Sequence, residues 1–190
     1  MKRIAITGSD LRDDEGKWIS VILSKGWDAV HLRHPAATLA EMRRLIESVP
    51  QQYHSRLRLH GHFELTNEFN LGGLHLNSRC PVAPPHFSGS LSRSCHSVEE
   101  ITHADRHLDY VTLSPVFDSI SKPGYTAAFS DYELEVIGTI SSPVVIALGG
   151  VTPQLTPSLE KWGFGGYAVL GYLWQAADRQ DLTRRLRQFV

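Results

Sequence analysis

The chain has 190 residues, of which 42% are hydrophobic and 21% charged, which fits one globular domain with a sizeable core. Its formal net charge of −1 gives no general attraction to nucleic acid or to an anionic membrane surface, so we expect neither as a partner. The start of the chain does not resemble a signal peptide, and no apolar run reaches the roughly 18 residues that span a bilayer. Two cysteines are too few for a disulfide framework, so we expect a cytoplasmic protein.

Eight apolar segments rich in β-forming residues recur along the chain, and we predict a strand at each. They lie near residues 3–7, 28–33, 57–60, 73–76, 91–94, 109–113, 144–148 and 166–170. Helical patterns follow several of these segments, and such alternation is typical of βαβ units around a parallel sheet. We therefore predict that residues 1–190 form one compact α/β domain, a (β/α)8 TIM barrel, with an open doubly wound sheet as the alternative.

Three capping boxes predict where helices begin, because a Ser or Thr is followed three residues later by Glu. The pairs are Thr38 with Glu41, at the start of a helix over 39–49, Ser97 with Glu100, and Ser130 with Glu133. Thr152 and Pro153 predict a further helix start, with the threonine as the cap.

Two connections depart from the regular pattern. Residues 79–90 contain Pro81, Pro84 and Pro85, so we predict no regular helix there. Residues 114–130 form a long polar connection after the sixth strand, which is typical of a lid or a binding loop.

The last two predicted strands both end at glycine, at 149–150 and at 171. Glycine lets a ligand approach the backbone N–H groups, and the loops after strands seven and eight of a barrel commonly bind phosphate. Ser121 and Lys122 lie in the long connection and could close over such an anion. The alternatives are that the glycines only permit turns and that Lys122 is a solvated surface residue.

Polar residues gather where the predicted strands end, which is the catalytic face of a barrel. Five of these residues are His31, Arg33, His60, His96 and Ser114. His96 directly precedes the predicted helix cap Ser97, and the positive end of that helix favours a neutral imidazole suited to general acid–base catalysis. The alternative is that His96 only forms a hydrogen bond at the helix start. Arg33 at the barrel mouth suggests an anionic partner.

Histidines at several strand ends raise the question of a metal site. Acidic residues that could support zinc-binding histidines are scarce there, so we predict no metal. We expect His75 to be an interior side chain and Cys95 to be a small buried residue, not a nucleophile.

The sequence resembles the thiamine phosphate synthase/TenI superfamily, whose members are compact (β/α)8 barrels. The resemblance covers essentially the whole chain, and the series from the fifth strand to the eighth is specific in combination. The matching segments are Ala5–Thr7, Val30–Arg33, Gly73–Leu76, Ser94–Ser97 with Glu99 and Glu100, Asp109–Val111, Ser114–Phe117 with Ser121 and Lys122, Ala147–Val151 and Gly166–Val169.

The superfamily holds two activities, and departures from the pattern distinguish them. Synthases join a pyrimidine diphosphate to a thiazole phosphate with Mg²⁺, using Asn-Asp after strand three and a second Asp after strand four. Those positions here are His60-Gly61 and Cys80, so both metal carboxylates are missing. The synthases' Arg-Glu-Lys after strand two is replaced by Arg33-His34-Pro35, which lacks the lysine.

The resemblance therefore favours the TenI-type thiazole tautomerase, which moves a proton on a carboxythiazole phosphate without metal or cofactor. It implies that His96 is the catalytic acid/base and that a phosphorylated thiazole is the partner. By the resemblance, phosphate would be held by Lys122, Gly149, Gly150 and Gly171. We name His31, Arg33, His60, Ser114 and Ser121 as further candidate substrate-binding residues, although His60 has no clear counterpart in the family. The alternatives are a thiamine phosphate synthase that acquires Mg²⁺ in another way and a non-catalytic module that binds a thiazole or thiamine phosphate. The sequence leaves the oligomeric state open, a homo-oligomer included.

Overall fold

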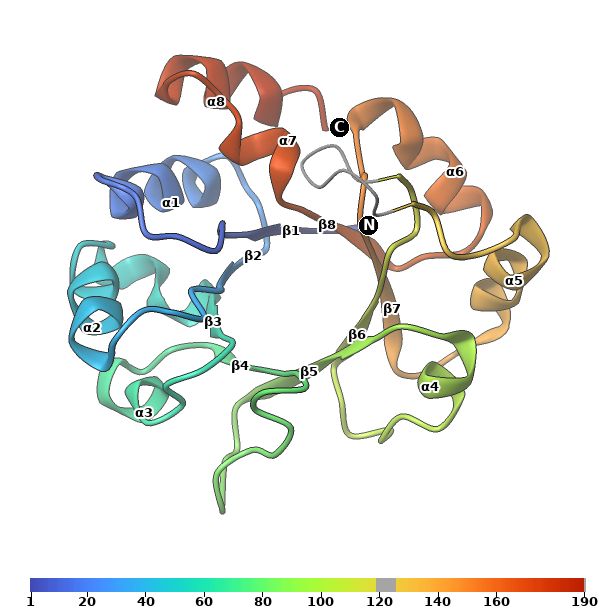
Figure 1. Cartoon of the computed structure of the whole chain (residues 1–190), viewed down its shortest axis with the longest axis horizontal. Helices are drawn as coiled ribbons and strands as arrows, with labels where there is room; N and C mark the ends of the chain where they lie inside the picture. The colour runs from blue at the N-terminus through green and yellow to red at the C-terminus, as the bar shows by residue number, and fades with distance from the viewer. Residues whose placement is uncertain (119–125, 190) are drawn as a thin grey trace.

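The computed structural model describes residues 1–118 and 126–189. Eight parallel strands form a closed barrel in which each strand pairs with the next and β8 pairs with β1 (Figure 1). The strands are β1 (Lys2–Ile6), β2 (Ala29–Leu32), β3 (Leu57–Leu59), β4 (Gly73–Leu76), β5 (Ser90–Cys95), β6 (Tyr110–Leu113), β7 (Val144–Leu148) and β8 (Gly166–Val169). The predicted (β/α)8 barrel is confirmed, and each predicted strand agrees with the observed one to within one residue at either end.

The helices form a ring around the barrel (Figure 1). They are α1 (Glu15–Ser24), α2 (Leu39–Glu47), α3 (Leu65–Phe69), α4 (Val98–Thr102), α5 (Asp131–Val136), α6 (Thr156–Lys161), α7 (Gly171–Trp174) and α8 (Arg179–Leu186). The proline-rich connection between β4 and β5 contains no helix, as predicted, and extends away from the barrel in Figure 1. Of the helices that the structure describes, none is long and apolar enough to cross a membrane.

Local hydrogen bonds explain where several helices begin. The Thr38 hydroxyl accepts the N–H of Glu41 at 3.3 Å, and the Glu41 carboxylate accepts the N–H of Thr38 at 2.8 Å. Ser130 and Glu133 form the same reciprocal pair before α5. These two of the three predicted capping boxes are confirmed, and each satisfies two backbone N–H groups that a helix start leaves without partners.

The predicted helix start at Thr152 is wrong in one respect. Pro153 opens a 3-10 turn over Pro153–Leu155 that leads into α6, but the Thr152 side chain makes no capping hydrogen bond. A capping side chain accepts the N–H of the second or third residue, and here the N–H of Leu155 donates to the Thr152 carbonyl at 3.1 Å instead.

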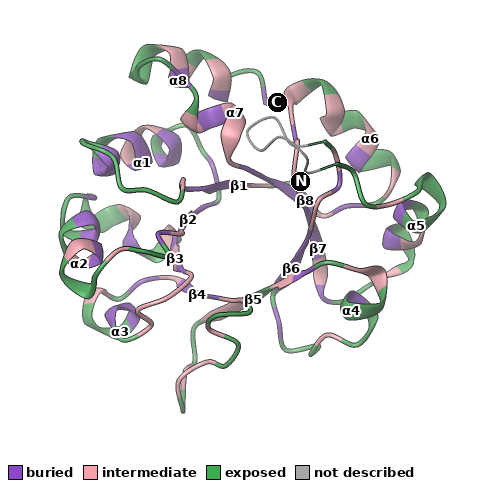
Figure 2. Ribbon diagram, viewed as in Figure 1, coloured by how far each residue is buried: buried purple, intermediate pink, exposed green. Residues whose placement is uncertain are grey.

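Two apolar layers hold the barrel together. The larger layer includes fully buried Trp27, Leu32 and Ile46. Figure 2 shows buried residues both along the strands and on the helices around them. The smaller layer lies inside the barrel and consists of Ile4, Ile6, Ala29, Tyr110, Ile146 and Ala168. The inner layer leaves much of the interior of β2–β6 to polar side chains, which are the residues of interest for function.

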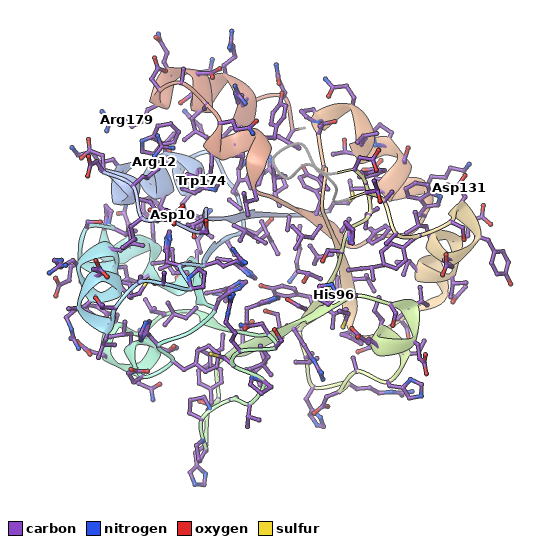
Figure 3. All side chains as sticks on the ribbon, viewed as in Figure 1. Asp10, Arg12, His96, Asp131, Trp174 and Arg179 are labelled. Carbon is purple, nitrogen blue, oxygen red and sulfur yellow. The ribbon has the colours of Figure 1, made fainter. Side chains whose placement is uncertain are left out.

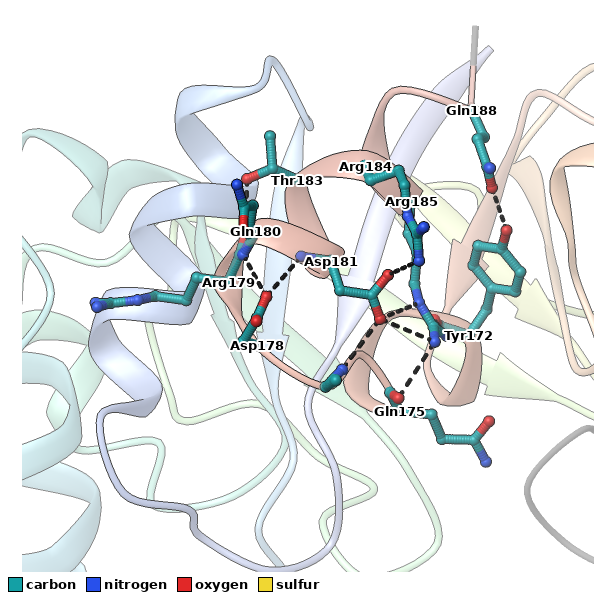
Figure 4. A network of polar contacts seen from close by, with 11 residues as sticks. Tyr172, Gln175, Asp178, Arg179, Gln180, Asp181, Thr183, Arg184, Arg185 and Gln188 are labelled. Atoms are coloured by element: carbon teal, nitrogen blue, oxygen red, sulfur yellow. Dashed lines mark hydrogen bonds and ion pairs between the residues drawn. The ribbon is translucent and has the colours of Figure 1, made fainter.

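A polar network connects α7 to α8 and so supports the chain that follows β8 (Figure 4). The Asp178 carboxylate caps α8 by accepting the N–H groups of residues 180 and 181 at 2.8 and 2.7 Å. Arg185 donates to the carboxylate of Asp181 at 3.1 Å and to the carbonyl of Tyr172 at 2.7 Å. These bonds fix α7, whose first turn lies at the barrel mouth.

Candidate functional site

A cavity of about 340 Å³ lies at the carboxyl ends of the barrel strands. In barrel enzymes this end carries the active site, because the loops that follow the strands converge there. Residues that directly follow strands line the cavity: Arg33 after β2, His60 after β3, Asn77 after β4, His96 after β5, Ser114 after β6, Gly149 after β7 and Leu170 after β8.

Glycines form the wall of the cavity beside β7 and β8. Gly149 and Gly150 have φ angles of 98° and 64°, a left-handed conformation that side chains rarely allow. A Cβ at Gly149 would lie 2.9 Å from the Cα of Pro115, and a Cβ at Gly150 would meet the backbone at Phe117. The turn and the close approach of residues 115–118 are therefore sufficient reasons for both glycines. The same residues, together with Gly171, line the cavity.

His96 lies at the barrel mouth near β6 (Figure 3). Its Nδ1 is 3.1 Å from the carbonyl oxygen of Ser114, and since a carbonyl only accepts, Nδ1 carries the hydrogen. A neutral ring then has its lone pair on Nε2. The backbone N–H of His96 donates to the carboxylate of Glu100 at 2.7 Å. The capping box predicted at Ser97 is thus only half formed: Ser97 accepts the N–H of Glu100, whose carboxylate binds one residue earlier than expected.

Two guanidinium groups, those of Arg33 and Arg79, line the cavity beside β2 and the connection after β4. Asn77 anchors that connection, because its amide donates to the carbonyl of His60 at 2.9 Å and its oxygen accepts the N–H groups of Arg79 at 3.1 Å and Cys80 at 3.3 Å. No Asp or Glu lines the cavity within the described ranges 1–118 and 126–189, so its charge there is positive.

Mg²⁺, which the superfamily's synthases use, does not fit these residues. A Cβ built at Gly61 would lie 3.9 Å from the Sγ of Cys80. The two positions where the synthases carry aspartates therefore face each other here without a carboxylate. Mg²⁺ is a hard cation that proteins hold through one or two carboxylates, and imidazole, thiol and guanidinium groups do not replace them.

Beneath the cavity, polar side chains of β2–β6 form a buried hydrogen-bonded network. His31 Nδ1 is 2.9 Å from His60 Nε2, and His31 Nε2 is 2.5 Å from the hydroxyl of Tyr110. His75 bonds to the hydroxyls of Ser92 at 2.8 Å and Ser94 at 2.9 Å.

Burial keeps the three imidazoles of this network neutral. It lowers the pKa of His75 from 6.5 to about 3. Burial also lowers the pKa of His31 and of His60 well below the usual value, and the neighbouring His75 adds to the effect.

Most of the predicted site residues surround one cavity: Arg33, His60, His96, Ser114, Gly149, Gly150 and Gly171. The sequence-based prediction for His31 needs correction. This residue was expected to bind substrate, but it is fully buried and contacts His60 and Tyr110 instead of the cavity. Ser121 and Lys122 fall outside the described residues.

The sequence prediction did not assign Asn77, Arg79, Ser94 or Tyr172 to the site, although all four line the cavity. Ser94 could have been found from its alternation with His96 along β5. Arg79 lies in a connection without periodicity, so no pattern identifies it.

The two interior predictions are confirmed. His75 is only 1% exposed, and it also forms part of the cavity wall. Cys95 is 1% exposed, and burial raises the pKa of its thiol to about 11. A thiol with that pKa carries almost no thiolate near neutral pH, so Cys95 is not a nucleophile.

Relatives of known name are similar in sequence over nearly the whole chain. A thiamine-phosphate synthase of Cronobacter sakazakii is 25% identical over 190 residues, covering 93% of this chain and 89% of that protein. A thiamine-phosphate synthase of Archaeoglobus fulgidus is 23% identical over 192 residues, covering 97% and 91% respectively.

Solved structures give the same result. The thiamine phosphate pyrophosphorylase of Bacteroides thetaiotaomicron is 34% identical, covers 100% of this chain and 95% of its own, and superposes with a TM-score of 0.87. The thiamine phosphate pyrophosphorylase of Pyrococcus furiosus is 20% identical with a TM-score of 0.80, covering 99% and 93%, and this likeness supports the fold.

These comparisons overturn the isomerase hypothesis. The curated relatives are named as thiamine-phosphate synthases, which are transferases, the solved structures are named as thiamine phosphate pyrophosphorylases, and none of those described above is named as a tautomerase. The prediction that this chain is a thiazole tautomerase is therefore wrong. That His96 is a catalytic residue stays a prediction.

The superfamily resemblance itself is confirmed. The family model described as thiamine monophosphate synthase matches residues 4–173, from β1 to the turn of α7 that closes the cavity. Since this match spans residues of all eight strands and nearly all residues that line the cavity, the chain belongs to the thiamine monophosphate synthase (TenI) family of thiamine biosynthesis.

Proposed function

We propose that this protein is a thiamine phosphate synthase, a transferase that joins a pyrimidine diphosphate to a thiazole phosphate. One observation carries the proposal: the same cavity at the barrel mouth is lined by Gly149, Gly150 and Gly171 and by Arg33 and Arg79. Two phosphorylated substrates need two anion-binding regions, and this cavity offers both. The names of the relatives point to the same reaction.

The thiazole phosphate is assigned to the glycine wall. Gly149, Gly150 and Gly171 have no side chain to keep a phosphate from the backbone N–H groups. Loops after the seventh and eighth strands commonly hold phosphate in barrels of this type. In this assignment the phosphate anchors the substrate and takes no part in the bond changes.

The diphosphate is assigned to Arg33 and Arg79. In the transfer, the bond between the pyrimidine methylene carbon and a diphosphate oxygen breaks, and the thiazole nitrogen forms a bond to that carbon. The electron pair of the broken bond leaves with the diphosphate, which gains negative charge. Guanidinium groups bind such oxygens through two parallel hydrogen bonds and stabilise the developing charge. His96, with its acceptor nitrogen at Nε2, is assigned to a donor group of the substrate.

A second function is favoured by the loss of carboxylates at Gly61 and Cys80. A barrel that keeps both anion-binding regions but lacks ligands for Mg²⁺ could bind a thiazole or thiamine phosphate without turnover. It would then act as a regulatory binding module.

One experiment distinguishes the two functions. The full chain is mixed with pyrimidine diphosphate and thiazole phosphate, with Mg²⁺ or with a chelator, and thiamine phosphate is measured over time. We expect the wild-type chain to form product and Gly171→Ala to bind thiazole phosphate more weakly. The side chain of His107 is 96% exposed, so His107→Gln is the control and is expected to form product at the wild-type rate. Tight binding of the substrates without product would contradict the transferase and support the binding module.

Cytoplasmic location belongs to this proposal, because it follows from the expected substrates. The oligomeric state remains a prediction that size measurement in solution would settle.

A further inference from the structure

We propose that His31, His60 and His75 form a binding site for one divalent transition-metal ion of the zinc type beneath the cavity. Each residue offers one ring nitrogen, and the three nitrogens lie within 4.8 Å of one another. The histidines come from β2, the end of β3 and β4, which are adjacent in the barrel. The inference rests on this geometry alone and is independent of the proposed reaction.

The chemistry of the ligands selects the class of metal. Neutral imidazole binds zinc, copper, cobalt and nickel ions well, and three histidines with one open position form a familiar zinc-binding set. A zinc ion at about 2.1 Å from each nitrogen in tetrahedral geometry places those nitrogens about 3.4 Å apart. This value lies between the 2.9 Å that separates His31 Nδ1 from His60 Nε2 and the 4.8 Å within which all three nitrogens lie.

The outer contacts of the histidines are those that metal ligands need. A metal-bound imidazole usually uses its second nitrogen to hold a fixed hydrogen bond, which sets the orientation of the ring. His31 has such a partner in the hydroxyl of Tyr110 at 2.5 Å, and His75 has one in the hydroxyl of Ser92 at 2.8 Å. The Nε2 of His75 lies 2.9 Å from the hydroxyl of Ser94, so a metal ion bound there replaces that hydrogen bond. Both partners are buried: Ser92 lies on β5, which pairs with the strand of His75, and Tyr110 reaches His31 from β6 across the barrel interior.

Two nitrogens that face each other mark the position of the ion. His31 Nδ1 and His60 Nε2 are 2.9 Å apart, so without a cation they must share one proton between them. A metal ion replaces that proton and accepts both lone pairs. His60 and His75 also line the cavity, so the fourth coordination position opens toward a ligand or water there.

This site differs from the magnesium site of the superfamily in its ligands, and from our sequence-based expectation that the protein holds no metal. The acidic residues whose scarcity argued against a metal are replaced, as outer partners, by a phenol and a serine hydroxyl. Such partners are not visible from the spacing of histidines in the sequence.

The test uses the full chain after treatment with a chelator and dialysis. Zinc binding is measured by calorimetry, and cobalt is used as a spectroscopic probe because its visible absorption reports nitrogen ligands and coordination number. We expect one ion per chain, an affinity loss of at least about 100-fold in His60→Gln and in His75→Gln, and a loss of about 10–100-fold in Tyr110→Phe. His107→Gln removes an exposed histidine and is expected to bind as the wild type does.

Circular dichroism on each variant ensures that only folded chains are compared, and Tyr110→Phe preserves the packing should a histidine variant not fold. The absence of stoichiometric zinc and cobalt binding by the folded wild-type chain would overturn the proposal. Equal affinity in wild type, His60→Gln and Tyr110→Phe would overturn it as well, because the ion would then lie elsewhere. Neither result depends on whether thiamine phosphate is formed.

Discussion

The two halves of the barrel interior are built on opposite principles. Along β1, β7 and β8 the interior is apolar, with Ile4, Ile146 and Ala168 in contact. Along β2–β6 it is polar, with His31 and His75 held by hydrogen bonds. Apolar side chains need only fill space, whereas each buried polar atom needs a partner in the correct place. The polar half therefore specifies the positions of its side chains more strictly. The apolar half stabilises the fold and offsets the free-energy cost of burying these polar groups.

The cavity lies over both halves, and its two walls reflect the difference. The glycine wall follows β7 and β8, where the backbone itself is exposed to a ligand. The imidazole and guanidinium wall follows β2–β4, where side chains carry the chemistry. Four predictions test this division, ordered by expected effect on the free energy of unfolding.

The largest effect is expected in the apolar half. Ile146 is fully buried inside the barrel, and Ile146→Ala removes methyl and methylene groups that close packing cannot replace. We expect a loss of about 2–5 kcal/mol in the free energy of unfolding, measured by urea denaturation at neutral pH. A loss below about 1 kcal/mol would show that the apolar half is not the stabilising half.

Acid is expected to destabilise the protein through the polar half. The pKa of His75 is about 3 in the folded chain and 6.5 as the ordinary value, so between these pH values the unfolded chain binds the additional proton. Stability therefore falls as the pH is lowered from 6.5, by about 1.4 kcal/mol per pH unit from His75 alone. His31 and His60 act in the same direction, because burial lowers their pKa too.

Urea denaturation from pH 6.5 to 4.5, in the presence of a chelator, measures this slope. His75→Gln is expected to reduce it, whereas His107→Gln, which changes a surface residue, is expected to retain the wild-type slope. An unchanged slope in His75→Gln would mean that other groups cause the acid sensitivity.

Much of the fold could be predicted because its signals are local. Apolar strands bounded by turns and a Thr38–Glu41 pair three residues apart depend only on near neighbours in the chain. At Ser97 the same pair of residue types behaves differently, since the carboxylate of Glu100 reaches the N–H of His96. That choice depends on where β5 ends in space, which the sequence pattern does not contain.

The sequence predicts which way the site's side chains point, but not how deeply each one is buried. Alternation along β2 indicates that His31 points inward, yet only the closed barrel shows that it lies buried against His60. The activity was mispredicted for a related reason. Missing carboxylates at Gly61 and Cys80 show which metal ligands are absent, but they do not determine which reaction the remaining residues perform.

A smaller effect is expected from two matched hydroxyls in the polar half. Ser92→Ala removes the partner of His75 Nδ1 and leaves a buried nitrogen without a hydrogen bond, which costs about 1–3 kcal/mol. Thr112 is equally buried, but its hydroxyl has no hydrogen-bond partner among the described residues. Thr112→Val is therefore expected to be neutral or stabilising. Equal losses in both variants, by thermal denaturation, would show that burial and not hydrogen bonding decides the cost.

The smallest effect on stability is expected at the rim of the polar half. Arg79 is exposed and lines the cavity, so Arg79→Ala should change the free energy of unfolding by less than about 0.5 kcal/mol. The same change removes one of the two guanidinium groups assigned to the diphosphate. We expect inorganic diphosphate to bind about 10-fold more weakly, measured by calorimetry, and inorganic phosphate at the glycine wall to bind as before. If Arg79→Ala weakened the binding of diphosphate and phosphate equally, the two walls would act as one anion-binding site. The difference between the two halves would then apply to the barrel interior and not to the cavity.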